Sequence, residues 1–140
     1  MATYDNDMFD ARAMVKVQNA VSFGTTTASA TDGANTTPTC YLPQFFRRCK
    51  VNKVEMVVTT IPDAGSTALK ASFLNGTDTF ATVTLTTATA GKVLHGSVTA
   101  ANSTFTASAA PTVVVTGTST ASADAQGSYD IYFEVQELFE

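Results

Sequence analysis

The chain carries few residues that could perform acid–base chemistry. His95 is its only histidine, so a serine or cysteine nucleophile would depend on that one residue as its base. Its place within an expected strand, between Leu94 and Gly96, does not by itself suggest a catalytic base. Neither a Gly-x-Ser-x-Gly motif nor a glycine-rich phosphate loop occurs in the 140 residues. The sequence therefore predicts a protein that is not an enzyme.

Metal ligands are equally sparse. Cys40, Cys49 and His95 offer at most three soft ligands, and the spacing of the cysteines matches no common zinc motif. The three aspartates before residue 11 lack the glycine and the closing glutamate of an EF-hand loop. We expect no metal and no other cofactor. Folding in a cytoplasm would favour free thiols over a disulfide.

The charge balance argues against nucleic acid as a partner. The net charge is −4 and the pI is about 4.8, whereas phosphate neutralisation needs a basic face. The N-terminal run MATYDNDMFDAR is acidic and contains no long apolar core, so it reads as neither a signal peptide nor a membrane helix. We therefore expect no membrane partner and assembly in a cytoplasm.

One short segment, CYLPQFFRRCKV at residues 40–51, concentrates aromatic and basic side chains. It is either an ordinary solvated bend or an anion-facing contact patch, because guanidinium groups suit carboxylates in bidentate pairs. Neighbouring residues of an extended chain point to opposite faces, so we expect one phenylalanine to enter the core and the other to contact a neighbour. The candidate contact residues are Phe45, Phe46, Arg47, Arg48 and Lys50.

A second candidate contact is the N-terminal arm, residues 1–10. It is acidic, yet it contains the apolar residues Tyr4, Met8 and Phe9. Such an arm is either disordered or docks against another chain, since a flexible segment can order on binding.

The elements that must position these residues are predicted to be strands. Only 14 % of the chain is charged, against about 25 % in typical domains, and 25 threonines occupy many of the polar positions. Threonine suits a half-buried pleated surface. Alternating apolar residues predict a long strand over 11–23 with one buried face. They predict a second such strand over 128–139.

The remaining strands are shorter. We expect them over 40–42, 53–61, 69–74, 80–86, 92–99 and 111–117, with loops over 24–38 and 100–110. A five-residue loop, Asn75–Thr79, would pair Phe73 with Ala81 and keep the apolar faces aligned, which a two-residue turn would not. About eight strands in one domain, residues 11–140, predict an all-β, two-sheet antiparallel sandwich of the jelly-roll type behind the arm at 1–10.

The whole chain resembles the jelly-roll cementing or decoration proteins of tailed bacteriophage capsids. The resemblance rests on the threonine- and alanine-rich β pattern, the apolar-dotted arm in YDNDMFDARAMVKV and the sparse catalytic inventory. It implies a structural virion protein on the capsid exterior, a homodimer or homotrimer that binds the major capsid protein and stabilises its lattice. We expect the arm from Tyr4 to Phe9 and the segment from Phe45 to Lys50 to face the capsid.

Two other classes remain open. A carbohydrate- or receptor-binding jelly roll of a viral fibre or spike would use exposed aromatic residues, and this chain has no tryptophan and four tyrosines. A coat protein that forms the shell itself is disfavoured, because no strongly basic face is available for a genome.

Overall fold

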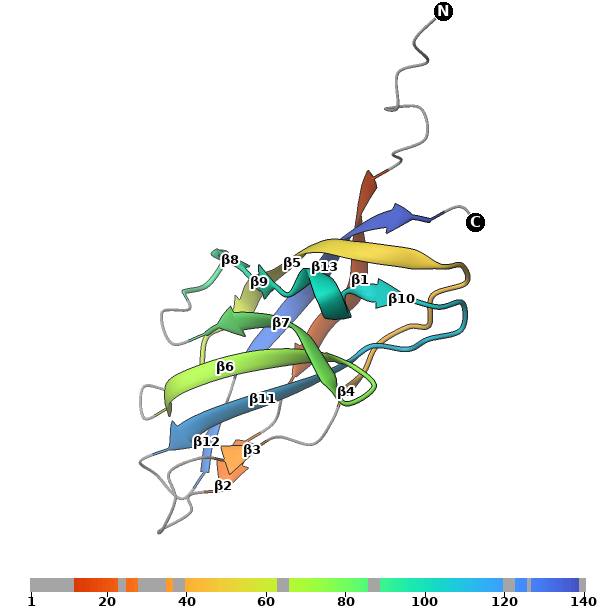
Figure 1. The fold of residues 1–140 in the computed structure, drawn as a ribbon. Coiled ribbons are helices and arrows are strands. Elements are labelled where there is room, and N and C mark those ends of the chain that lie inside the picture. Colours follow the sequence, from red (N-terminus) through yellow and green to blue (C-terminus); the bar gives the residue numbers. More distant parts are fainter. Residues whose placement is uncertain are drawn as a thin grey trace, which may run out of the picture.

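The computed structural model describes residues 12–22, 25–27, 35–36, 40–62, 66–85, 89–119, 123–125 and 127–138. Within these ranges the regular secondary structure is β-strand, apart from one short 3-10 helix, η2 (Ala100–Asn102). Two antiparallel sheets pack face to face as a sandwich (Figure 1). The predicted all-β sandwich is therefore confirmed.

Every pairing in the two main sheets is antiparallel. The five-stranded sheet contains β1 (Arg12–Ser22), β13 (Ser128–Glu137), β5 (Cys49–Thr60), β10 (Thr104–Phe105) and β8 (Val93–His95). The six-stranded sheet contains β3 (Asn35–Thr36), β4 (Cys40–Tyr41), β11 (Thr112–Ser119), β6 (Ser66–Asn75), β7 (Asp78–Thr84) and β9 (Ser97–Val98). A separate short ladder joins β2 (Thr25–Thr27) to β12 (Ala123–Ala125).

The order of the strands is that of a jelly roll. One sheet runs β1-β13-β5-β10, and the other runs from β3 and β4 through β11 and β6 to β7. The first long strand thus pairs with the last, and successive strands of the two main sheets alternate between them except at β3–β4 and at the β6–β7 hairpin. As a result, the start of β1, the end of β13 and the start of β5 lie at one end of the sandwich (Figure 1).

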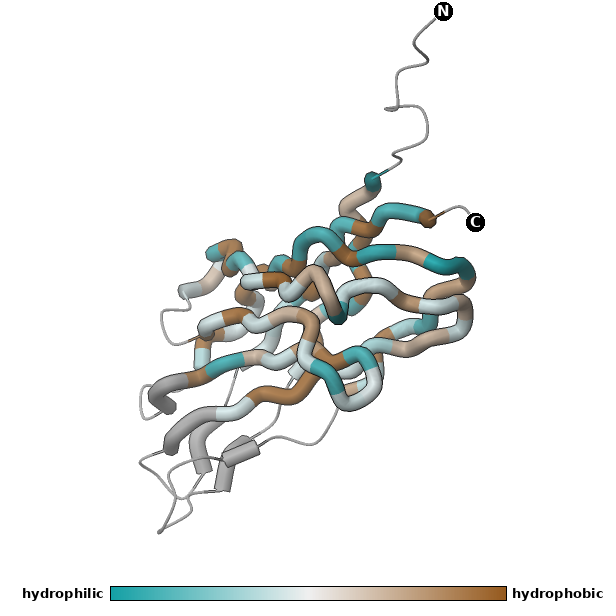
Figure 2. Tube along the Cα trace, viewed as in Figure 1, coloured by the Kyte–Doolittle hydropathy of each residue, from teal (hydrophilic) through white to brown (hydrophobic). Residues whose placement is uncertain are grey.

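The core lies between the two sheets. It forms because hydrophobic and polar residues alternate along the long strands, which Figure 2 shows as brown and teal segments. Its centre is an aromatic cluster in which Phe133 of β13 lies edge-on to Phe73 and Phe80, with ring centroids 5.8 and 5.9 Å apart. Phe105 of β10 joins at 5.0 Å from Phe80. Edge-to-face packing of this kind adds to the burial of apolar area.

One long side of the sandwich is closed by β8 and β9. β8 pairs with β5 in one sheet and β9 pairs with β7 in the other, so the chain crosses between the layers at Gly96. The Gly96 N–H donates to the Val54 carbonyl at 2.8 Å, and a Cβ at this position would lie 3.0 Å from that same oxygen. A glycine therefore allows the close crossing.

The hairpin between β6 and β7 corrects one expectation. Phe73 pairs with Ala81 as predicted, but the turn has two residues, Gly76 and Thr77, in place of a five-residue loop. A β-bulge after Phe73 restores the register, because an extra residue on one strand shifts its side chains back to the required face.

Other expectations at the level of elements were also wrong. The predicted loop 24–38 contains β2 and β3, and the predicted loop 100–110 contains η2 and β10. The predicted strand 92–99 is split at Gly96. These elements are two or three residues long, too short to show a period. Within the described ranges, no helix is long and apolar enough to cross a membrane.

Candidate contact surface

The two phenylalanines after β4 divide between core and solvent, as expected. The Phe45 ring is half-buried and packs 4.9 Å from Phe105 and 6.4 Å from Phe133. Two backbone bonds fix its position, because the Phe45 N–H donates to Ala109 and its carbonyl accepts from Ser108. The Phe46 side chain is 96 % exposed. An aromatic ring held out in water by an anchored neighbour marks a surface suited to contact.

Phe46 borders a shallow hollow of about 400 Å³ at the end of the sandwich. We call it the end patch. It is lined by Phe46, Arg47, Arg48, Thr106, Ala107, Glu137 and Leu138. The Leu138 N–H donates to the Arg48 carbonyl at 3.0 Å, so the segment after β13 is tied to the chain that enters β5.

The basic residues of the segment do not act together. Arg47 donates from Nη1 to Glu137 Oε1 at 2.7 Å, and this bond raises the pKa of the guanidinium. Lys50 lies on β5 beside Gln136 and Thr104, on the outer face of the sheet. Within the described part of the chain, neither Lys50 nor Arg48 forms an ion pair. Arg48 is thus the cation of the end patch that remains available to an external carboxylate.

A second hollow, the apolar groove, adjoins the first and has a volume of about 290 Å³. It is lined by Val15, Lys16, Val17, Pro43, Gln44, Phe45, Phe46 and Val135. Val17, Phe45 and Val135 also pack against the core. The groove is therefore a place where the core comes to the surface.

The groove exists because β1 is only partly covered. Alternation predicts one buried face along the whole strand, but residues 12–16 are all exposed, and Val21 alone in β1 is buried. Val15 points to the same side as its cross-strand neighbour Phe133, which is fully buried, yet Val15 is 44 % exposed. The described strands of the opposite sheet therefore leave this half of β1 uncovered.

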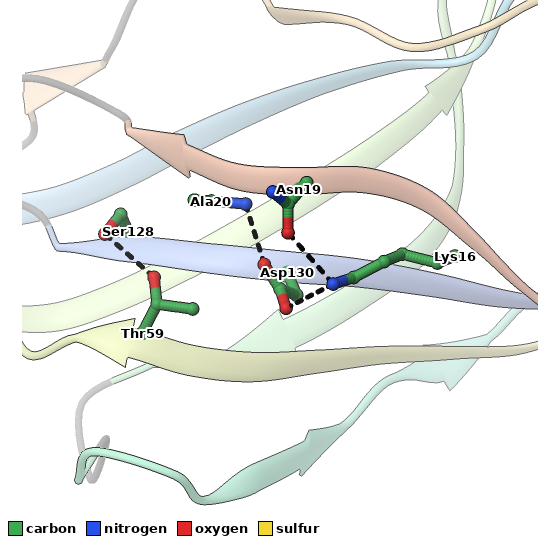
Figure 3. A network of polar contacts seen from close by, with 6 residues as sticks. All are labelled: Lys16, Asn19, Ala20, Thr59, Ser128 and Asp130. Atoms are coloured by element: carbon green, nitrogen blue, oxygen red, sulfur yellow. Dashed lines mark hydrogen bonds and ion pairs between the residues drawn. The ribbon is translucent and has the colours of Figure 1, made fainter.

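The outer face of the same strand carries a polar network (Figure 3). The Asp130 carboxylate forms an ion pair with Lys16 at 2.7 Å and accepts a hydrogen bond from the Ala20 N–H at 2.7 Å. Both bonds stabilise the charged Asp130 carboxylate and lower its pKa. The hydrogen bond with Asp130 raises the pKa of Lys16. Lys16 also donates to Asn19. The network holds β1 to β13 around two register shifts.

The residues that could do chemistry are scattered. The His95 Nδ1 lies 3.0 Å from Glu55 Oε1 on an exposed face. Both thiols are free, and burial raises the pKa of Cys40 and raises that of Cys49 to about 11, so neither is a ready nucleophile at neutral pH. Among the described residues, no group of three potential ligands could hold a metal ion.

The structure places some predicted contact residues together and leaves others aside. Phe46, Arg47 and Arg48 meet at the end patch, whereas Tyr4, Met8 and Phe9 lie outside the described residues. Sequence reasoning missed the groove residues Val15 and Val135, because period-two alternation identifies the inward face of a strand but not whether a second layer covers it.

No protein-family model, no curated protein and no solved structure matches the chain.

Proposed function

We propose that this protein is a structural virion protein that binds the exterior of a tailed-phage capsid and stabilises the lattice of the major capsid protein. The observation that carries the proposal is Phe46, which is almost fully exposed at one end of the sandwich. It lies beside Arg48, which forms no ion pair with any described residue. Aromatic and arginine side chains dominate the binding energy of protein contacts. The end patch is the surface proposed to face the capsid.

The chemistry of the surface fits repeated weak attachment. The end patch offers one exposed ring and one available guanidinium, which together suit a neighbouring carboxylate and an apolar contact. A lattice presents many identical sites, so modest affinity for each copy still gives high occupancy when copies are linked. The proposal assigns the chain no catalytic role and no cofactor.

Binding to purified capsids tests the proposal. Phe46→Ala and Arg48→Glu should each lower the occupancy measured by co-sedimentation at least fivefold, because each removes a central contact worth about 1–2 kcal/mol or more. The attachment of Arg48→Glu should also depend less on salt, since an interfacial ion pair is lost. Arg47 is a poorer probe because its reversal also breaks the pair with Glu137.

Matched controls lie at the other end of β5. Lys92→Glu reverses the charge of an exposed side chain whose backbone carbonyl accepts a hydrogen bond from the Val58 N–H. Val93→Ala shortens an exposed valine. Both should leave occupancy unchanged. Wild-type occupancy for Phe46→Ala and Arg48→Glu together would contradict the assignment of the end patch.

The alternative is a carbohydrate- or receptor-binding module, and the observation that favours it is Tyr41, whose side chain is 75 % exposed at the end of β4. Sugar sites use exposed aromatic rings for stacking. A glycan array separates the two functions: specific binding that is lost in Tyr41→Ala would favour the module, and its absence together with capsid co-sedimentation would favour the virion protein.

A further inference from the structure

One long side of the sandwich leaves part of β1 uncovered. β8 and β9 close one side. On the other side, the first half of β1 faces, among the described residues, the coil at residues 43–46. Inward-facing Val15 is left 44 % exposed above the core residue Phe133. Burying apolar area of this kind is favourable by about 25 cal/mol per Å², so an added segment would be stabilised here.

The backbone of β1 offers a second attachment. Among the described strands, β1 pairs only with β13, which leaves its other edge open along Ala13 to Val15. Beyond Lys16, two register shifts interrupt the regular edge. An unpaired edge next to an apolar groove is the arrangement that accepts an extended segment as an added strand.

The charges near the groove indicate which segment of the chain could bind there. If two β1 strands paired with each other antiparallel about Met14, Arg12 of each copy would face Lys16 of the other, and like charges directly opposite are destabilising. The N-terminal arm has the opposite character, with three aspartates, no basic residue before Arg12, and apolar side chains at Tyr4, Met8 and Phe9. Its carboxylates complement Lys16, the cation that lines the groove and that also pairs with Asp130.

The arm is poorly placed to reach the groove of its own chain. Only Asp10 and Ala11 separate Phe9 from β1, and Val15 follows Arg12 by three residues. Folding back onto the edge of β1 would need a tight hairpin, for which two-residue turns favour a glycine that is absent here. A second copy can approach the groove without this reversal.

We propose that the apolar groove and the open edge of β1 bind the acidic arm, residues 4–9, of a second copy of this chain. The chain thus forms a homo-oligomer by exchanging arms, and the arm faces a neighbouring copy rather than the capsid. Phe46 lies at the border between the groove and the end patch. This inference does not rest on the proposed capsid function.

The experiment measures mass by light scattering and sedimentation for four proteins: the full chain, a variant lacking residues 1–9, Val15→Glu, and Val93→Glu as a control. Val15→Glu places a carboxylate in the groove against the arm's aspartates, while Val93 is similarly exposed, at 41 %, on the closed side. The full chain and Val93→Glu should be oligomers of at least twice the monomer mass. The truncated chain and Val15→Glu should be monomers.

Mixing the two monomeric variants gives the sharpest result. The truncated chain keeps an intact groove and Val15→Glu keeps an intact arm, so the mixture should form a one-to-one complex that neither protein forms alone. A peptide of residues 1–10 should also bind the truncated chain and shift the NMR signals of the Val15, Val17 and Val135 methyl groups. This second measurement does not depend on the folding of Val15→Glu.

Three results would overturn the inference: a monomeric full chain, a truncated chain that remains oligomeric, or a peptide that leaves the groove methyl signals unchanged. A monomeric full chain that loses thermal stability on truncation would indicate that the arm docks on its own chain. Capsid binding by a truncated chain that retains the end patch is a separate result, so failure of the two proposals can be distinguished.

Discussion

At the scale of single residues, Asp130 is expected to make stability depend on acid pH. Lys16 and the Ala20 N–H hold its pKa below the usual value near 3.8. Since the folded-state pKa is lowered, its stabilising contribution is complete above the unfolded value and is lost as pH falls through the folded one. The difference in unfolding free energy between wild type and Asp130→Asn should therefore be largest near neutral pH and shrink below about pH 4.

Denaturant unfolding followed from pH 7 to pH 2.5 measures this difference. Asp78→Asn is the control, because Asp78 is exposed in the β6–β7 hairpin and forms no ion pair within the described residues. Its curve should stay parallel to wild type. A constant offset for Asp130→Asn across the whole range would show that the carboxylate charge contributes nothing.

A second prediction at this scale concerns Gly127, which precedes β13 with φ at +80°. A Cβ there would lie 2.5 Å from the Thr60 carbonyl oxygen and 2.9 Å from the Tyr129 hydroxyl. Gly127→Ala should lower the unfolding free energy by about 2–3 kcal/mol, because backbone strain and overlap add. Gly76→Ala is the matched control, with φ at +63° and open space around it; it should cost only about 1 kcal/mol. Equal losses would contradict a steric role for Gly127.

At the scale of elements, long strands were predictable and short ones were not. β1 and β13 each carry enough alternating residues to define a face, and the Phe73–Ala81 pairing followed from matching apolar faces. The bulge after Phe73 could not be inferred, because a two-residue turn plus a bulge satisfies the same pattern as a longer loop. β10 has two residues, so tertiary pairing with β5 decides its conformation.

The crossing from β8 to β9 yields a prediction for these elements. In Gly96→Val the added side chain would meet the Val54 carbonyl oxygen and the Val83 methyl group, which lie 3.0 and 3.1 Å from a Cβ. β8 and β9 should separate from β5 and β7, so their amides should exchange with solvent at least tenfold faster, while the β1–β13 ladder stays protected. Uniform loss of protection across both sheets would mean that the crossing is not a local closure.

At the scale of the whole molecule, the sequence identified part of the candidate surface. The adjacent residues Phe45 and Phe46 predict one buried and one exposed ring, and the sequence indicates Arg48 as a candidate contact for a carboxylate. The pairing of Arg47 with Glu137 joins residues 90 positions apart, so it depended on the three-dimensional arrangement. The apolar groove likewise arises from the incomplete second layer over β1, which no local pattern encodes.

In the proposed attachment, the end of the sandwich that carries Phe46 and Arg48 faces the outside of a capsid. Cryo-electron microscopy of the native particle tests it most directly. We expect sandwich-shaped density outside the shell, with the end patch toward the major capsid protein and the β8–β9 crossing away from the contact. Particles whose outer surface lacks this density, or copies attached by another face, would contradict it.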